Sequence, residues 1–129
     1  MSHYILFILL LIGLDLGAEV YYYSFGEKVP LKPLHETRTI NQHTIRYYEL
    51  PTGEKIGVKH QIIIGCKEFE KCREILKAYP VTDIEKLSDR LYLLTLQKGS
   101  DLFGIANELY HKKPIFLSHP NFVKQRKQR

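Results

Sequence analysis

The sequence predicts an α+β fold in which two helices pack on one face of a four-stranded sheet, preceded by an N-terminal β-hairpin extension. From Ile62 onward, short apolar runs and two amphipathic stretches follow in the order strand, helix, strand, strand, helix, strand. The composition, with 44% hydrophobic and 26% charged residues, is that of an ordinary globular domain. This β-α-β-β-α-β order is that of the split βαβ, or ferredoxin-like, two-layer sandwich.

Residues 1–18 predict a secretory signal peptide. Tyr4 to Leu14 is an uncharged apolar run of eleven residues, shorter than the about 20 residues that a membrane-spanning helix needs. Small residues up to Ala18 offer a cleavage site before Glu19. The first three residues contain no Lys or Arg, so an uncleaved membrane anchor is the alternative. Export predicts a secreted or periplasmic protein with no stable membrane span after signal cleavage.

Charge argues against nucleic acid as a partner. Removing Asp15 with the signal peptide leaves 19 basic and 13 acidic residues, a net charge of +6. Four of those bases lie in the last six residues, so the body of the chain is only mildly basic. Residues 124–129 are expected to be a solvated basic tail.

The N-terminal extension is expected over residues 19–55. Residues 20–23 favour a strand, a turn follows at Gly26, and Pro30 and Pro33 restrict the next segment to an edge or to irregular structure. The polar residues 35–44 predict a loop, and residues 45–50 predict another strand.

The ferredoxin-like unit is expected over residues 56–123. A buried strand over 61–65 leads to a helix that ends at Pro80, and two strands over 81–87 and 91–97 form a hairpin. Ser100 or Asp101 can cap a second helix, which ends before Pro114, and a last strand begins at Ile115. The apolar positions that define the two helices are Phe69, Cys72, Ile75, Leu76 and Tyr79, and then Leu102, Phe103, Ile105, Ala106, Leu109 and Tyr110.

The chain has two cysteines, Cys66 and Cys72. Their spacing matches no zinc-binding pattern, and there is no second pair. Export permits a disulfide between them. Because Cys72 falls on the apolar side of a predicted helix, an inert buried thiol is at least as well supported.

The sequence predicts no enzyme and no catalytic, metal or cofactor site. It contains no nucleophile elbow, phosphate-binding glycine loop or paired zinc-binding histidines. Its six histidines are scattered, and none is four residues from another. Asp83, Glu85 and Asp89 lie along one predicted hairpin, where they form either an acidic pair or, more commonly, a solvated face.

Three stretches carry a family resemblance. "DLFGIANELYHKKPIFLSHPNF" resembles the end of the N-terminal prodomain of subtilisin-like serine proteases, through residues 106–110 in its helix and 119–122 at its end. His119 stands where that family usually has an acid. "YYYSFGEKVPLKPL" is similar to the N-terminus of some bacterial members, and "TGEKIGVKHQIII" to the entry into their first prodomain strand.

The resemblance implies an inhibitor or folding chaperone that binds a subtilisin-like serine protease, in trans or in cis. In that family the open sheet face packs on two protease helices, and the C-terminal tail lies in the active-site cleft. The residues expected to contact the partner through this tail are His119, Pro120, Asn121, Phe122, Val123 and Lys124. The protease domain itself is absent from this sequence. A secreted, non-inhibitory binding module of the same fold and a fragment of a longer protease are the alternatives.

Overall fold

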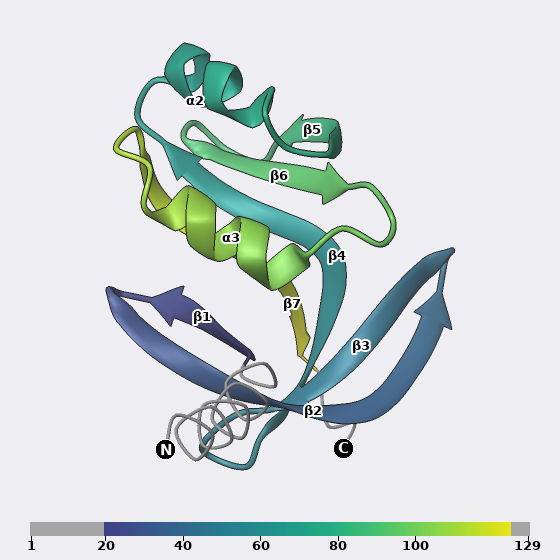
Figure 1. Cartoon of the computed structure of the whole chain (residues 1–129). Helices are drawn as coiled ribbons and strands as arrows, with labels where there is room; N and C mark the ends of the chain where they lie inside the picture. The colour runs from purple at the N-terminus through teal and green to yellow at the C-terminus, as the bar shows by residue number, and fades with distance from the viewer. Residues whose placement is uncertain (1–19, 125–129) are drawn as a thin grey trace, which may run out of the picture.

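The computed structural model describes residues 20–124, which form one curled antiparallel sheet and two short helices (Figure 1). The signal peptide expected over residues 1–18 lies outside the described residues, as does the tail expected over 124–129 except for Lys124, which ends the last strand. The elements in chain order are β1 (Val20–Ser24), β2 (Glu27–Ile40), β3 (His43–Glu49), β4 (Lys55–Cys66), α2 (Phe69–Leu76), β5 (Val81–Lys86), β6 (Leu91–Leu96), α3 (Leu102–Tyr110) and β7 (Ile115–Lys124).

β4 is the strand around which the sheet is built. The order is β1-β2-β3-β4-β6-β5, and β7 pairs with β4 outside this path. The first residues of β4 pair with β3, and residues 61–65 pair with β6. β7 follows β4 from residue 56 to residue 66, with two register shifts. One long strand therefore joins the N-terminal strands to the rest of the sheet.

The ferredoxin-like β-α-β-β-α-β sandwich with a separate hairpin extension is wrong as a fold class. Strands make up 57% and helices 16% of the described residues, in a mostly antiparallel, curled sheet. The sheet has more than four strands because β4 begins at Lys55, earlier than expected, and its residues 55–58 pair with β3. The boundary expected between residues 55 and 56 falls at the start of this strand.

The predicted loop over residues 35–44 is also wrong, since most of it belongs to a hairpin formed by β2 and β3. Asn41 and Gln42 connect these strands with φ values of 49° and 69°, the positive values that a two-residue hairpin turn of type I′ requires. Every side chain from residue 35 to residue 44 is exposed. A strand exposed on both faces has no apolar alternation, so its sequence resembles a polar loop.

The elements expected from residue 61 to residue 117 are present as strands and helices close to their predicted positions. Alternate residues of β4 and β6 face the helices and are buried. Ile62, Ile64, Leu94 and Leu109 are fully inaccessible to solvent, and they belong to the main core together with the apolar sides of α2 and α3. The apolar periodicity of the sequence therefore predicts this core, although not the extent of the sheet around it.

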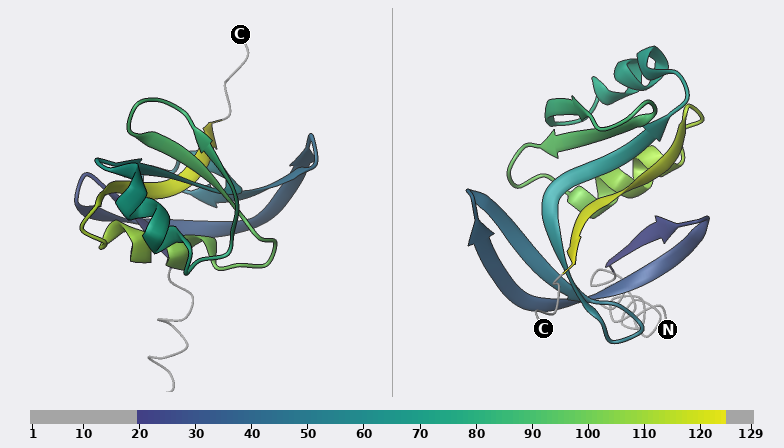
Figure 2. Two further views of the ribbon diagram at one scale, coloured as in Figure 1. Left: turned by 90° about the horizontal axis from the view of Figure 1, so that it is seen from above. Right: turned by 180° about the vertical axis from the view of Figure 1, so that it is seen from behind.

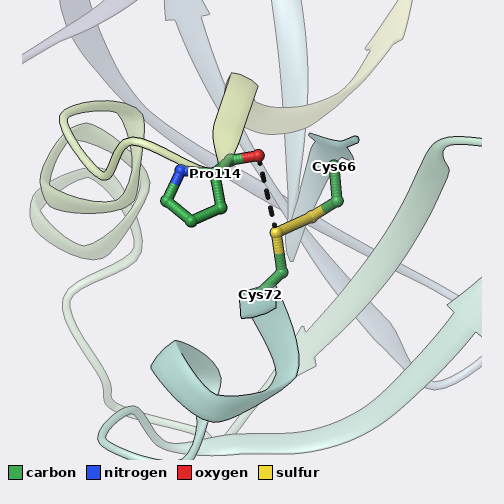
Figure 3. Close-up of a disulfide and its surroundings, with 3 residues drawn as sticks. All are labelled: Cys66, Cys72 and Pro114. Atoms are coloured by element: carbon green, nitrogen blue, oxygen red, sulfur yellow. Dashed lines mark hydrogen bonds between the residues drawn. A yellow bond between two sulfur atoms is a disulfide. The ribbon is translucent and has the colours of Figure 1, made fainter. Parts of the chain in front are cut away.

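A disulfide joins Cys66, the last residue of β4, to Cys72 in α2 (Figure 3). Both cysteines are buried. Cys72 therefore lies on the predicted apolar side of its helix, but as half of a disulfide and not as a free thiol. Sγ of Cys72 lies 3.7 Å from the carbonyl oxygen of Pro114. A disulfide sulfur carries no proton, so this approach is a packing contact. The bond fixes α2 to the end of the central strand.

Candidate protein-binding face

His60 is the described histidine whose ring hydrogen-bonds a hydroxyl side chain: its Nε2 lies 2.9 Å from Oγ of Ser100 and 3.1 Å from the carbonyl oxygen of Gln97. The Ser100 hydroxyl itself donates to that carbonyl at 2.6 Å. A carbonyl oxygen accepts only, so the tautomer with a proton on Nε2 satisfies all three groups. This trio therefore holds the turn before α3.

Within residues 20–124, no group of three or more His, Cys, Asp or Glu side chains converges on a point where a cation could sit. Asp83 and Glu85 lie on β5, opposite Thr95 and Leu93 of β6, while Asp89 lies in the connection between these strands. All three carboxylates are exposed, in agreement with a solvated face.

The residues expected in a protease cleft lie inside β7. Their backbones pair with β4, from His119 opposite Ile63 to Lys124 opposite Ile56. Pro120 is fully buried. The ring of Phe122 packs on Tyr22 with the ring centroids 4.7 Å apart. This segment would have to leave the sheet before it could lie in another protein as an extended tail.

The stretches that carry the family resemblance meet in space. Nδ2 of Asn107 in α3 donates to the carbonyl oxygen of Tyr21 in β1 at 3.0 Å. Tyr23 stacks on Tyr110 with their centroids 4.5 Å apart and the rings nearly parallel. With the Tyr22–Phe122 contact, parts of the "YYYSFGEK", "ANELY" and "HPNF" segments hold β1 against α3 and β7. These motif residues therefore have a structural role that their sequence spacing could not reveal.

Neither of the described helices covers the side of the sheet opposite α2 and α3 (Figure 2, right). Several apolar side chains of β4, β6 and β7 lie on this side. Neighbouring side chains of a strand point to opposite faces of the sheet. The buried side chains of β4 and β6 point towards the helices, so the residues that alternate with them point to this side. The sequence-distant residues Ile63, Leu91, Leu93 and Leu117 are half-buried here, although cross-strand pairing places them side by side. We call this side, with its members Ile63, Leu91, Leu93, Phe116 and Leu117, the open face.

Phe116 is the most exposed member of the open face, with 48% of its surface accessible. Its ring lies over Gly65, where an added Cβ would come within 2.5 Å of Cζ of the ring. Glycine therefore lets the aromatic ring lie close against the strand. The sequence does not mark Phe116 as exposed, because this residue lies in an apolar run, "PIFL", that is typical of a buried strand.

A chain of amide and hydroxyl groups borders the open face. Nδ2 of Asn121 donates to Oε1 of Gln61 at 2.9 Å, and Nε2 of Gln61 donates to Oγ1 of Thr95 at 3.1 Å. These bonds connect β7, β4 and β6. Asp83 and Glu85 on β5 border the open face as well. Their cross-strand partners on β6 are Thr95 and Leu93, and paired residues point to the same side of a sheet. The face is thus an apolar strip with a polar end and an acidic edge.

Tyr79 supplies a pH-dependent contact on the helical side. Its hydroxyl donates to Oε1 of Glu108 at 2.8 Å. Desolvation, this hydrogen bond and the carboxylate charge together raise the pKa of Tyr79 to about 12. The unfolded chain has the ordinary tyrosine pKa near 10. The contact therefore stabilises the fold fully below about pH 10 and loses this contribution as the pH rises towards 12.

Between pH 10 and pH 12 we expect the free energy of unfolding to fall less for Tyr79→Phe than for the wild type. Urea unfolding at a series of pH values measures this difference, and titration of lysines and of the other tyrosines is common to both proteins. Tyrosinate absorbance should show one high-pKa tyrosine fewer in the variant. Parallel stability curves for the two proteins would contradict the assignment.

No protein-family model, no curated protein and no solved structure matches this chain. Neither of the helices described between residues 20 and 124 has the length and apolarity that a membrane crossing requires.

Proposed function

We propose that this chain is a protein-binding module that docks a subtilisin-like serine protease through the open face. The observation that carries the proposal is the apolar strip formed by Ile63, Leu91, Leu93, Phe116 and Leu117 on the uncovered side of the sheet. The sequence resemblance suggests the class of partner, because the family's prodomains bind protease helices through an open sheet face.

The physical case for docking rests on the kind of surface that this face presents. Phe116 offers a large aromatic surface supported by backbone, and aromatic side chains dominate the energetics of many interfaces. The neighbouring aliphatic side chains lie on paired strands and cannot collapse into the core. Association with another apolar surface would remove these side chains from water.

The acidic edge suits the expected partner surface. Asp83 and Glu85 are exposed on β5, beside the strip. Helix N-termini carry partial positive charge, which favours nearby carboxylates. A protease surface that presents helices by their N-terminal ends would therefore match both the apolar strip and its acidic border.

Pairing of β7 favours a binding mode in which the sheet stays intact. His119 and Phe122 are held opposite β4, and Pro120 is fully buried. We therefore assign docking to the open face and give residues 119–123 the role of maintaining the sheet beside it. The same observation supports a second candidate, a module that binds the protease without blocking its cleft. The Cys66–Cys72 disulfide suits the oxidising, secreted or periplasmic location that both proposals require.

We expect Leu93→Asp to weaken the complex with a subtilisin-like protease by at least about tenfold, which corresponds to about 1.4 kcal/mol. A carboxylate in the middle of the strip would lose its hydration on docking without gaining a partner. Titration calorimetry measures the affinity, and hydrolysis of a peptide substrate measures inhibition. Ile40→Asp is the matched control, because Ile40 is an exposed aliphatic residue in the β2–β3 hairpin.

Equal loss of affinity in both variants would contradict docking through the open face. Absence of any complex with the wild-type chain would overturn the proposed partner. Binding with full protease activity would favour the non-inhibitory module, whereas binding with inhibition would favour the inhibitor.

A further inference from the structure

Phe25 stands out as a second surface feature, away from the open face. Its side chain is fully exposed, with a relative accessibility of 102%. With Gly26 it connects β1 to β2, and the two residues have φ values of 50° and 82°. These positive angles define a two-residue turn in which Asn-Gly is strongly preferred. An aromatic residue here is both strained and solvated, a combination that the fold does not require.

The hairpin that carries Phe25 is firmly braced. Tyr23 stacks on Tyr110 and makes an edge contact with His111, at centroid distances of 4.5 and 5.1 Å. Gly26 lies close to α3 as well, since a Cβ added at this residue would lie 3.8 Å from the hydroxyl oxygen of Tyr110. The Phe25 ring is therefore presented on a rigid tip beside the C-terminal end of α3, on the side of the molecule that holds the helices.

Three lysines lie in the segments that flank this tip. Lys28 lies over the ring of Tyr21, with Nζ 4.6 Å from the ring centroid. Lys112 and Lys113 follow His111 directly in the chain. None of these three lysines forms an ion pair with another described residue. The carboxylates of the same segments are Glu27 in the hairpin and Glu108 in the last turn of α3, which accepts a hydrogen bond from Tyr79. The three lysines therefore outnumber the acids.

The size of the tip decides between two kinds of partner. Phe25 is flanked by the small residues Ser24 and Gly26, and a stable protein interface needs about 800 Å² from each partner. A two-residue turn offers far less contact than that. A lipid surface instead needs only an apolar group that protrudes, with cations near anionic headgroups and tyrosines at the level of the interface.

We propose that the β1–β2 tip makes a weak, reversible contact with anionic lipid surfaces, with Phe25 inserted and Lys28, Lys112 and Lys113 near the headgroups. The open face is on the other side of the sheet, so this contact leaves it free. The lipid contact does not depend on which protein binds the open face.

The chain contains no tryptophan, which allows a clean test. Phe25→Trp places a single reporter at the tip, and Phe116→Trp places one on the open face as the matched control. Each full-length variant is mixed with vesicles of phosphatidylcholine, with and without phosphatidylglycerol, and with vesicles of brominated lipid. Any contribution from residues outside 20–124 is common to both variants.

We expect the emission of Trp at position 25 to shift to shorter wavelength with anionic vesicles and to be quenched by brominated lipid. Trp at position 116 should show neither effect, and phosphatidylcholine alone should give a smaller shift. An unchanged emission at position 25, or equal responses at both positions, would overturn the proposal. A shift at position 25 on adding a protease but not vesicles would overturn it in favour of a protein pocket.

A second variant keeps the test independent of the reporter. Phe25→Asn introduces the preferred Asn-Gly turn, so the fold should melt at the same or a higher temperature. Co-sedimentation with anionic vesicles should nevertheless fall at least threefold relative to the wild-type chain. Unchanged co-sedimentation by a folded Phe25→Asn protein would contradict a role for this side chain.

Discussion

Reduction of the Cys66–Cys72 disulfide is expected to lower the free energy of unfolding by about 2 kcal/mol, because the bond restricts a short loop in the unfolded chain. The two cysteines are six positions apart, so the closed loop is small and the entropic effect lies at the lower end of the usual range. Urea unfolding with and without a reductant measures the change.

The control is a Cys66→Ala/Cys72→Ala variant, whose stability should not respond to the reductant. Both sulfur atoms are buried, so this variant should be less stable than the oxidised wild type by at least the same amount. Two thiols that react with a labelling reagent in the untreated native protein would contradict the disulfide.

Gly57→Ala is expected to destabilise the fold by about 1–3 kcal/mol, the usual cost of overpacking a core. A Cβ at this position would lie 2.6 Å from Cγ2 of Ile45, 3.1 Å from Cε1 of Tyr47 and 3.3 Å from the backbone oxygen of Val123. These three groups belong to β3 and β7, which flank β4. The substitution would therefore force apart the strands where the N-terminal part of the sheet joins the rest.

Gly65→Ala is the matched control for this prediction. Its added Cβ would meet the ring of Phe116, which is half-exposed and can turn away into solvent. We expect a smaller loss of stability than for Gly57→Ala, measured by thermal and urea unfolding. Equal losses for the two variants would show that packing between β3, β4 and β7 is not the cause.

Local patterns were sufficient where one face of an element is buried. Phe69, Cys72 and Leu76 lie at helical spacing, and α2 begins at Phe69 and ends at Leu76. Asp101 was a candidate helix cap, and its carboxylate accepts the backbone N–H of Gly104 at 3.1 Å. Burial imposes a period on such segments, so their sequence carries the information.

Local patterns failed where pairing between distant strands decides the structure. The segment "HETRTINQHT" is polar throughout, yet most of it lies in the β2–β3 hairpin. Its strands are held by backbone hydrogen bonds, to which side-chain polarity contributes little. The extension of β4 to Lys55 depends on β3 and β7 being available as partners, which a reading of the β4 residues alone does not reveal.

The candidate site shows the same division. The prodomain resemblance implies a partner contact for residues 119–124, and in the structure these residues belong to β7, which pairs with β4. The open face depends on cross-strand neighbours such as Ile63 and Leu93, which are separated by thirty positions in sequence. Phe25 could not be identified beforehand, since its exposure follows from the geometry of a turn.

The sequence by itself determined the positions of α2, α3 and the strands around them, because burial of one face leaves a periodic trace in the order of residues. Only the tertiary structure decided that these elements belong to one curled sheet, that the two cysteines meet, and which apolar residues remain uncovered. Those properties arise from contacts between residues far apart in the chain, and such contacts leave no periodic trace in either partner.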